Sequence, residues 1–167
     1  MTIIIYNILL SQIRGKFSKI LVTVDGSNES MDAADYAIAM AKKEDNNAHL
    51  IALHVLFSQL GDAYSTNLFG LVTPSSINEL LKDAKHEAQQ WFDKIKEKMC
   101  ENDIQLKTEV VVSSTSVVSA IVDYAENENV DLIVIGSRGR SGFKKLLLGS
   151  TASGVVTYAT CPVLVVK

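Results

Sequence analysis

The feature that most constrains the fold is a repeated alternation between short aliphatic runs and longer amphipathic segments. The runs are rich in Val, Ile and Leu and lack polar alternation, which is typical of strands buried on both faces of a sheet. The sequence predicts five such strands, at residues 20–24, 48–57, 106–112, 132–135 and 163–166.

Segments with helical spacing separate these strands. In the first of them, apolar residues from Met31 to Ala41 recur every three or four positions, and Ser27 or Asn28 precedes them as a candidate N-cap. Four helices are expected, at about residues 28–43, 77–99, 117–125 and 151–159. Parallel strands need crossover connections of this kind, so the pattern predicts one α/β domain with a five-stranded parallel sheet and helices on both faces. Residues 59–76 show no sustained period and are expected to form a long loop.

Charge and cysteine content exclude several classes of partner and site. The 167 residues are 47% hydrophobic, which suits one domain with a core of its own. The net charge of −3 is spread along the chain and gives no attraction to nucleic acid or to an anionic membrane. Cys100 and Cys161 lie far apart without CxxC spacing, so we read neither a zinc site nor a redox motif, and a reducing compartment is favoured.

The first eighteen residues form an extension before the regular pattern begins. Residues 1–10 are apolar, but Arg14 and Lys16 follow this run, whereas a signal peptide carries its positive charges in front. The run is also shorter than the ~20 residues of a membrane-spanning helix. We interpret residues 1–18 as an extra strand, a docking segment or a non-native start, in that order, and expect a cytoplasmic domain at residues 19–167.

Ligands of parallel sheets bind at the carboxyl ends of the strands, where the strand order reverses. The segment after the fourth predicted strand places Gly136 and Gly139 in a turn, and a helix is expected to begin near Gly149 and Ser150. Glycines let the backbone approach a ligand, and the free N–H groups of a helix start attract phosphate. The hydroxyls of Ser150 and Thr151 add donors. Four basic side chains raise the local positive potential: Arg138, Arg140, Lys144 and Lys145. Together these features favour anion binding over a purely structural turn.

The spacing of these residues matches neither GxxxxGK[ST] nor GxGxxG. Gly136, Gly139 and Gly149-Ser150 instead resemble the G-2x-G-9x-G-[ST] ATP-binding signature of the universal stress protein family, and residues 161–166 (CPVLVV) resemble that family's C-terminal end. The resemblance covers residues 19–167. It implies a Rossmann-like (adenine nucleotide alpha hydrolase-like) domain that binds ATP with a divalent cation and usually pairs as a homodimer through its last strand.

The resemblance also implies which residues bind the nucleotide. The glycines and Ser150 correspond to residues that hold the phosphates and ribose, Asp25 lies by the nucleotide, and Val55 lies by the adenine. The full expected set is Thr23, Val24, Asp25, Val55, Ile135, Gly136, Arg138, Gly139, Gly149, Ser150 and Thr151. Mg²⁺ is expected to be held mainly by the phosphates, and no residue is assigned as a catalytic group or metal ligand.

Other assignments stay open at this point. Asp25 suits either a helix cap or a ligand contact, and His54, inside an apolar run, is expected to be a hydrogen-bonded core histidine. The turn at residues 113–116 lacks the Gly and Pro that family members often show. We expect a regulatory homodimer whose ATP occupancy changes how it meets unidentified protein partners, with residues 59–76 as the moving part. The alternatives are a slow ATPase or phosphotransferase with Asp25 on the metal, and a carrier of flavin or another nucleotide.

Overall fold

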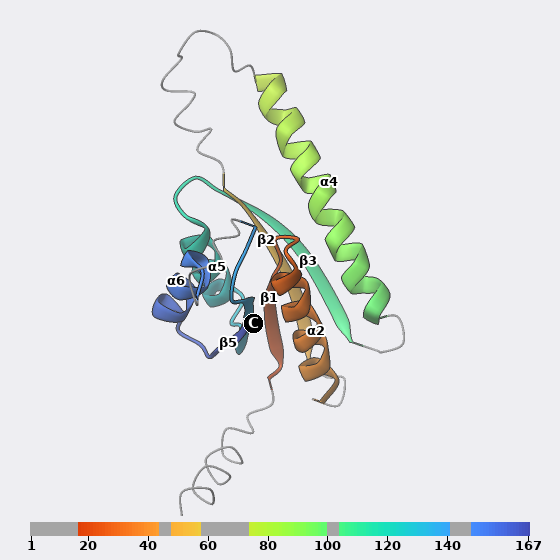
Figure 1. The fold of residues 1–167 in the computed structure, drawn as a ribbon, viewed down its shortest axis with the longest axis vertical. Helices are drawn as coiled ribbons and strands as arrows, with labels where there is room; N and C mark the ends of the chain where they lie inside the picture. Colours follow the sequence, from red (N-terminus) through yellow and green to blue (C-terminus); the bar gives the residue numbers. More distant parts are fainter. Residues whose placement is uncertain (1–16, 44–47, 58–73, 100–103, 141–147) are drawn as a thin grey trace, which may run out of the picture.

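The structure is a computed structural model that describes residues 17–43, 48–57, 74–99, 104–140 and 148–167 (Figure 1). The elements in chain order are β1 (Lys19–Thr23), α2 (Asn28–Lys43), β2 (His49–Phe57), α4 (Pro74–Met99), β3 (Gln105–Ser113), α5 (Val117–Asn127), β4 (Leu132–Gly136), α6 (Ser150–Tyr158) and β5 (Val163–Val166). The predicted extension at residues 1–18 lies outside this part of the chain except for residues 17 and 18.

The five strands form one parallel sheet in the order β3-β2-β1-β4-β5. The predicted α/β fold is therefore confirmed. From the central strand β1, the chain first builds outward through β2 to β3, then returns to place β4 and β5 on the other side. The strand order thus reverses between β1 and β4, and the carboxyl ends of these two strands flank the point where such sheets bind ligands.

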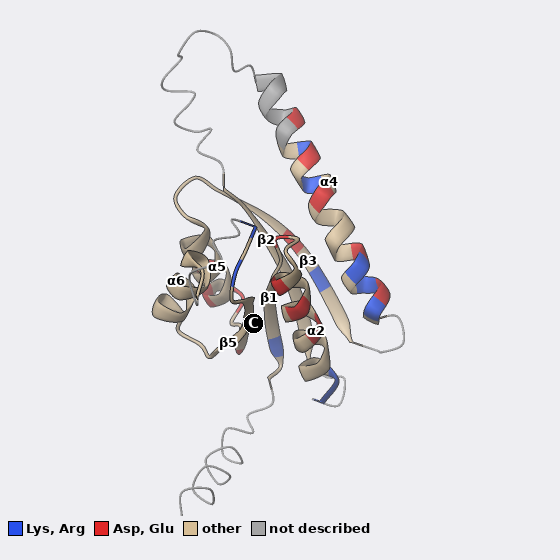
Figure 2. Cartoon of the chain, in the orientation of Figure 1, with Lys and Arg blue, Asp and Glu red and all other residues tan. Residues whose placement is uncertain are grey.

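Helices cover both faces of the sheet (Figure 1). Ile20 and Val22 of β1 pack with α2 and α4 on one face, and Leu21 packs with α5 on the other. All three side chains are completely buried, as expected for a strand enclosed on both faces. The core position predicted for Trp91 and Phe92 on α4 is also confirmed. Charged residues run along α4, as Figure 2 shows.

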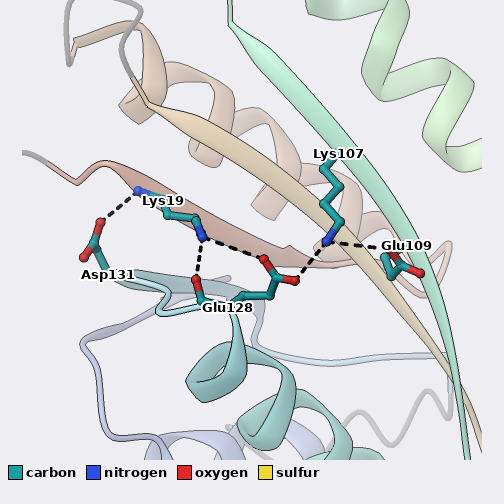
Figure 3. Close-up of polar contacts among 5 residues, drawn as sticks. All are labelled: Lys19, Lys107, Glu109, Glu128 and Asp131. Atoms are coloured by element: carbon teal, nitrogen blue, oxygen red, sulfur yellow. Dashed lines mark hydrogen bonds and ion pairs between the residues drawn. The ribbon is translucent and has the colours of Figure 1, made fainter.

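An ion-pair network joins the strands at the amino edge of the sheet (Figure 3). Lys19 donates from Nζ to the Glu128 carbonyl oxygen at 2.5 Å, while Lys107 on β3 donates to Glu128 Oε1 at 3.0 Å. Asp131 accepts two backbone N–H bonds, from Ser18 and Lys19, each at 2.8 Å. These contacts tie β1 and β3 to the turn between α5 and β4, on the side opposite the carboxyl ends of the strands.

The largest difference between a predicted and an observed boundary is at the start of α4. Helix α4 begins at Pro74, so residues 74–76 of the expected loop are helical. Proline suits the first turn of a helix because its missing N–H would have no partner there. Residues 59–73, the rest of that expected loop, lie outside the described residues. No helix in the described part of the chain is long and apolar enough to cross a membrane.

The turn from β1 into α2 depends on a glycine. Gly26 has φ 81°, which a side chain disfavours, and an added Cβ would lie 2.4 Å from two ring atoms of Trp91. Ser27 follows as the N-cap of α2, because its hydroxyl accepts the N–H of Ser30 at 3.2 Å. The contact with Trp91 places this turn directly against α4.

We predict that Gly26→Ala lowers the free energy of unfolding by about 2–4 kcal/mol, through backbone strain together with the clash against Trp91. Urea unfolding of the full chain measures this change. Trp91→Leu serves as the second variant, because in that background the clash is relieved and the cost of Gly26→Ala should fall. A cost below about 0.5 kcal/mol in the parent would contradict this account of the turn.

Candidate functional site

A cavity of about 180 Å³ opens at the carboxyl edge of the sheet, where β1 and β4 diverge. All the residues expected to bind the nucleotide lie in its wall: Thr23, Val24, Asp25, Val55, Ile135, Gly136, Arg138, Gly139, Gly149, Ser150 and Thr151. The structure thus brings together four segments separated by up to 128 positions in the sequence (from 23 to 151). Their role in binding stays a prediction.

The wall has an apolar part and a polar part. Leu53 and Val55 from β2 and Val117 and Ile121 from α5 supply aliphatic surface. The segment between β4 and α6 supplies backbone groups and basic side chains, and the first turn of α6 supplies the hydroxyls of Ser150 and Thr151. A ligand that fits both parts has a flat or apolar portion and an anionic portion, as a nucleotide does.

Asp25 joins the two turns beside the cavity. Its Oδ1 accepts the backbone N–H of Ser27 at 3.0 Å and the Ser27 hydroxyl at 2.5 Å, while Oδ2 accepts the backbone N–H of Arg140 at 3.2 Å. Asp25 therefore holds the capping residue Ser27, and Ser27 performs the capping. A Cβ on Gly139 would lie 2.5 Å from Asp25 Oδ2, so glycine there allows the two turns to approach.

Helix α6 directs its amino end at the cavity. Gly149 is its N-cap, and among the described residues no side chain hydrogen-bonds as a cap there. The Gly149 N–H donates to the Ser137 carbonyl at 2.7 Å, which fixes the start of the helix beside the β4 turn. The N–H groups of a first helical turn lack partners inside the helix and carry partial positive charge. With Ser150 and Thr151, they form a group of donors suited to an anion.

Gly136 is required by close packing between α2 and the end of β4. An added Cβ would lie 2.7 Å from the Glu29 carbonyl carbon and 2.9 Å from the Ser30 nitrogen, both in the first turn of α2. The missing side chain lets α2 pack tightly over the end of β4. Gly136 lines the cavity, but this close approach alone already requires glycine.

Two arginines of the glycine-rich turn lie in the cavity wall. The Nε of Arg138 is buried and has no hydrogen-bond partner among the described residues. A buried donor without a partner costs free energy, and an anionic ligand would supply the missing acceptor. Arg140 instead pairs with Glu87 of α4 at 3.1 and 3.3 Å. Lys144 and Lys145, which were expected to add positive charge, lie outside the described residues.

His54 is a cavity residue that we did not predict as part of the site. Its Nδ1 donates to the Val24 carbonyl at 2.6 Å, and its ring packs edge-on against Trp91 with centroids 5.1 Å apart. The prediction of a buried, hydrogen-bonded histidine is confirmed. Burial lowers the pKa of His54, although the Val24 carbonyl and the charge of Asp25 act in the opposite direction. Its place next to Val55 at the end of β2 is the sequence signal that could have identified it.

The serine-rich turn at residues 113–116 satisfies its own polar groups. The Ser113 hydroxyl donates to the Ser116 carbonyl at 3.2 Å, and the Ser116 hydroxyl caps α5 by accepting the N–H of Ser119 at 2.9 Å. The four residues of this turn are not among those that line the cavity. Side-chain hydrogen bonds therefore hold this turn, which has neither Gly nor Pro.

In the described part of the chain, no group of three or more His, Cys, Asp or Glu side chains is placed to hold a metal ion.

Comparison with known proteins identifies the family. The sequence pattern of the Universal stress protein family matches residues 16–167. This chain belongs to the universal stress protein family. It is 35% identical to universal stress protein YxiE of Bacillus subtilis, over 90% of this chain and 99% of the relative. It is 38% identical to universal stress protein MJ0531 of Methanocaldococcus jannaschii, over 97% and 91% of the two chains.

Solved structures of universal stress proteins share the fold. UspA from Lactobacillus plantarum superposes with a TM-score of 0.76 at 28% identity, covering 92% of this chain and all of the other. The predicted family is confirmed by these matches, which extend over the cavity and both turns beside it.

The lowered pKa of His54 predicts a loss of stability in acid. The unfolded chain takes up a proton near the ordinary pKa of 6.5, while the folded ring resists protonation until lower pH. The His54 contribution is therefore present above the unfolded pKa and is lost as the pH falls below it. We expect the drop in unfolding free energy between about pH 7.5 and about pH 5.5 to be smaller in His54→Asn.

Denaturant unfolding at the two pH values measures this difference. His86→Asn is the matched control, because His86 is exposed and its replacement should leave the drop unchanged. An equal drop in His54→Asn and in the parent would show that His54 does not carry the effect.

Proposed function

We propose that this universal stress protein binds ATP in the cavity between β1 and β4 and acts as a regulatory protein. The proposal rests on one observation: the cavity combines an aliphatic wall with donors that the described residues do not use, at the start of α6 and at the buried Nε of Arg138. An adenine ring would lie against Val55 and its apolar neighbours. The phosphates would lie at Gly149, Ser150 and Arg138.

Relatives of the same fold support this class of ligand. Three solved structures are described as universal stress proteins in complex with cAMP, with dAMP from Archaeoglobus fulgidus, and with AMP from Arabidopsis thaliana. They are 24%, 21% and 15% identical to this chain, a level at which the structural likeness by itself shows a shared fold. The proposal therefore rests on the residues of this cavity.

Asp25 and His54 hold the wall of the cavity in place. Asp25 accepts hydrogen bonds from Ser27 and from the backbone of Arg140, and His54 donates from Nδ1 to the Val24 carbonyl. Neither side chain is proposed as a catalytic group. The proposal assigns Mg²⁺ to the phosphates and gives ATP the role of a signal, which changes the surface that protein partners meet.

Gly149→Val tests the proposed site. A Cβ at this position would already lie 3.3 Å from the Ser137 carbonyl oxygen, and the larger side chain would cover the first N–H groups of α6. Loss of two charge-assisted hydrogen bonds of about 1.5 kcal/mol each predicts about 100-fold weaker binding of Mg-ATP. Calorimetric titration measures the affinity.

Thr157→Val places the same side chain at an exposed position on α6, away from the cavity, and should bind as the parent does. Thermal unfolding is the measurement that checks whether both variants are folded. Absence of Mg-ATP binding by the folded parent would overturn the proposed function, whereas equal binding by Gly149→Val would move the site elsewhere.

We also propose a cytoplasmic homodimer paired through β5. This strand is at one edge of the sheet and carries no charge, and neither does α6 beside it (Figure 2). Val156 and Tyr158 of α6 are exposed, at 48% and 68%. An apolar edge strand with exposed apolar neighbours is a favourable surface for pairing with a second copy.

Val165→Pro tests this pairing. The carbonyls of Pro162 and Val166 accept hydrogen bonds from β4. Successive residues of a strand direct their N–H and C=O groups to opposite sides, so the N–H of Val165, next to Val166, points away from β4 toward the free edge. Proline removes that outward N–H and leaves the bonds to β4 in place. We expect a monomer by sedimentation velocity, while Val165→Thr stays dimeric. A monomeric parent, or a dimeric Val165→Pro, would contradict pairing through this edge.

A further inference from the structure

Arg140 is held by two groups of α4. Its guanidinium donates to both carboxylate oxygens of Glu87, at 3.1 and 3.3 Å, and its Cζ lies 5.6 Å from the centroid of the Trp91 ring. Its backbone N–H is fixed separately, by Asp25 at 3.2 Å. The main chain of Arg140 is therefore anchored beside the cavity, whereas the long side chain can rotate without moving the turn.

The contact with Glu87 is one that a stronger anion can replace. The two side chains are 59% and 45% exposed, and exposed ion pairs are weakened by water and salt. Phosphate oxygens carry more charge than a carboxylate and accept bidentate bonds from arginine. Arg140 lies in the cavity wall, but Glu87 does not, so a phosphate in the cavity can reach Arg140 without displacing Glu87.

Arg138 and Arg140 consequently have different tasks. Arg138 has a buried Nε with no partner among the described residues, so it is ready for any anion that enters. Arg140 is already paired with Glu87, so a ligand binds its guanidinium only if the ligand is the stronger hydrogen-bond acceptor. A single phosphate bound at α6 and Arg138 does not need Arg140, so Arg140 would stay on Glu87. A longer phosphate chain places further negative charge near Arg140 and can compete with Glu87 for it.

We propose that Arg140 senses the length of the phosphate chain: it stays on Glu87 and Trp91 with a nucleoside monophosphate and transfers to the outer phosphates of a triphosphate. This inference rests on the proposed nucleotide site and adds the discrimination between ligands. The transfer breaks a contact between the glycine-rich turn and α4, so only the triphosphate would loosen α4 at this point.

Titration calorimetry of the full chain with Mg-ATP and with AMP tests the discrimination. In Arg140→Gln, Mg-ATP should lose about tenfold in affinity relative to AMP, because only the triphosphate uses this side chain. In Glu87→Gln, the competitor is gone, so the affinity for Mg-ATP should rise about threefold with AMP unchanged. The gain from Glu87→Gln should disappear in the double variant, because it acts through Arg140.

Asp35→Asn is the matched control. Asp35 pairs with Lys98 of α4 at 2.6 Å with similar exposure, but neither residue lines the cavity. Asp35→Asn removes one negative charge, as Glu87→Gln does, and should leave the ratio of the Mg-ATP and AMP affinities unchanged. If the ratio of the two affinities changed equally in Asp35→Asn and Glu87→Gln, the effect would come from the loss of a negative charge anywhere on the surface, and the inference would be overturned.

Trp91 offers an independent readout, because it is the only tryptophan in the chain. Removal of a cation from its ring alters the surroundings of the indole, so Mg-ATP should change the emission of the parent more than AMP does. Arg140→Gln should lose this difference. If both ligands bind but change the emission equally, and the affinity ratio is insensitive to Arg140, the inference fails while the proposed function stands. If neither ligand binds, the proposed function fails first.

Discussion

The central position of β1 is the constraint on which the rest of the structure depends. This strand pairs with β2 on one side and β4 on the other, and the side chains of its middle residues, Ile20, Leu21 and Val22, are completely buried. Because the chain leaves β1 toward β2 and β3 and then returns to place β4 on the other side, the strand order reverses beside its carboxyl end. The cavity is a consequence of this topology, and Asp25 is the first polar residue beyond the strand.

Close approaches then shape that opening. Gly26 allows Trp91 to pack against the turn between β1 and α2, and Gly136 allows α2 to pack against β4. Gly139 allows the glycine-rich turn to approach Asp25. Each glycine thus has a packing reason that is independent of any ligand. The same packing leaves the start of α6 and Arg138 with donors that the described chain does not use. Closely packed turns around donors that the described chain does not use would suit a preorganised site, which is why we propose the ligand at this edge of the sheet.

Helix α4 connects this site to the outer surface of the molecule. Trp91 forms a T-shaped contact with His54 and lies beneath the guanidinium of Arg140, so one side chain joins the end of β2 to the glycine-rich turn. Glu87, one helical turn earlier, holds the same arginine. A change in the pairing of Arg140 would therefore alter the environment of α4, and this gives nucleotide occupancy a physical route to a surface that partners can contact.

The sequence by itself determined the elements and most of the residues that line the cavity. Hydrophobic periodicity is local, so it located all five strands and four helices, and the spacing of Gly136, Gly139 and Gly149 identified the turn and the family. It misplaced the start of α4, because Pro74 suits either a loop or a first helical turn. Only the tertiary structure decided the strand order and the contacts of His54, Trp91, Glu87 and Arg140. These residues come from β2, α4 and the β4 turn, and contacts between elements far apart in the chain leave no periodic signal in the sequence.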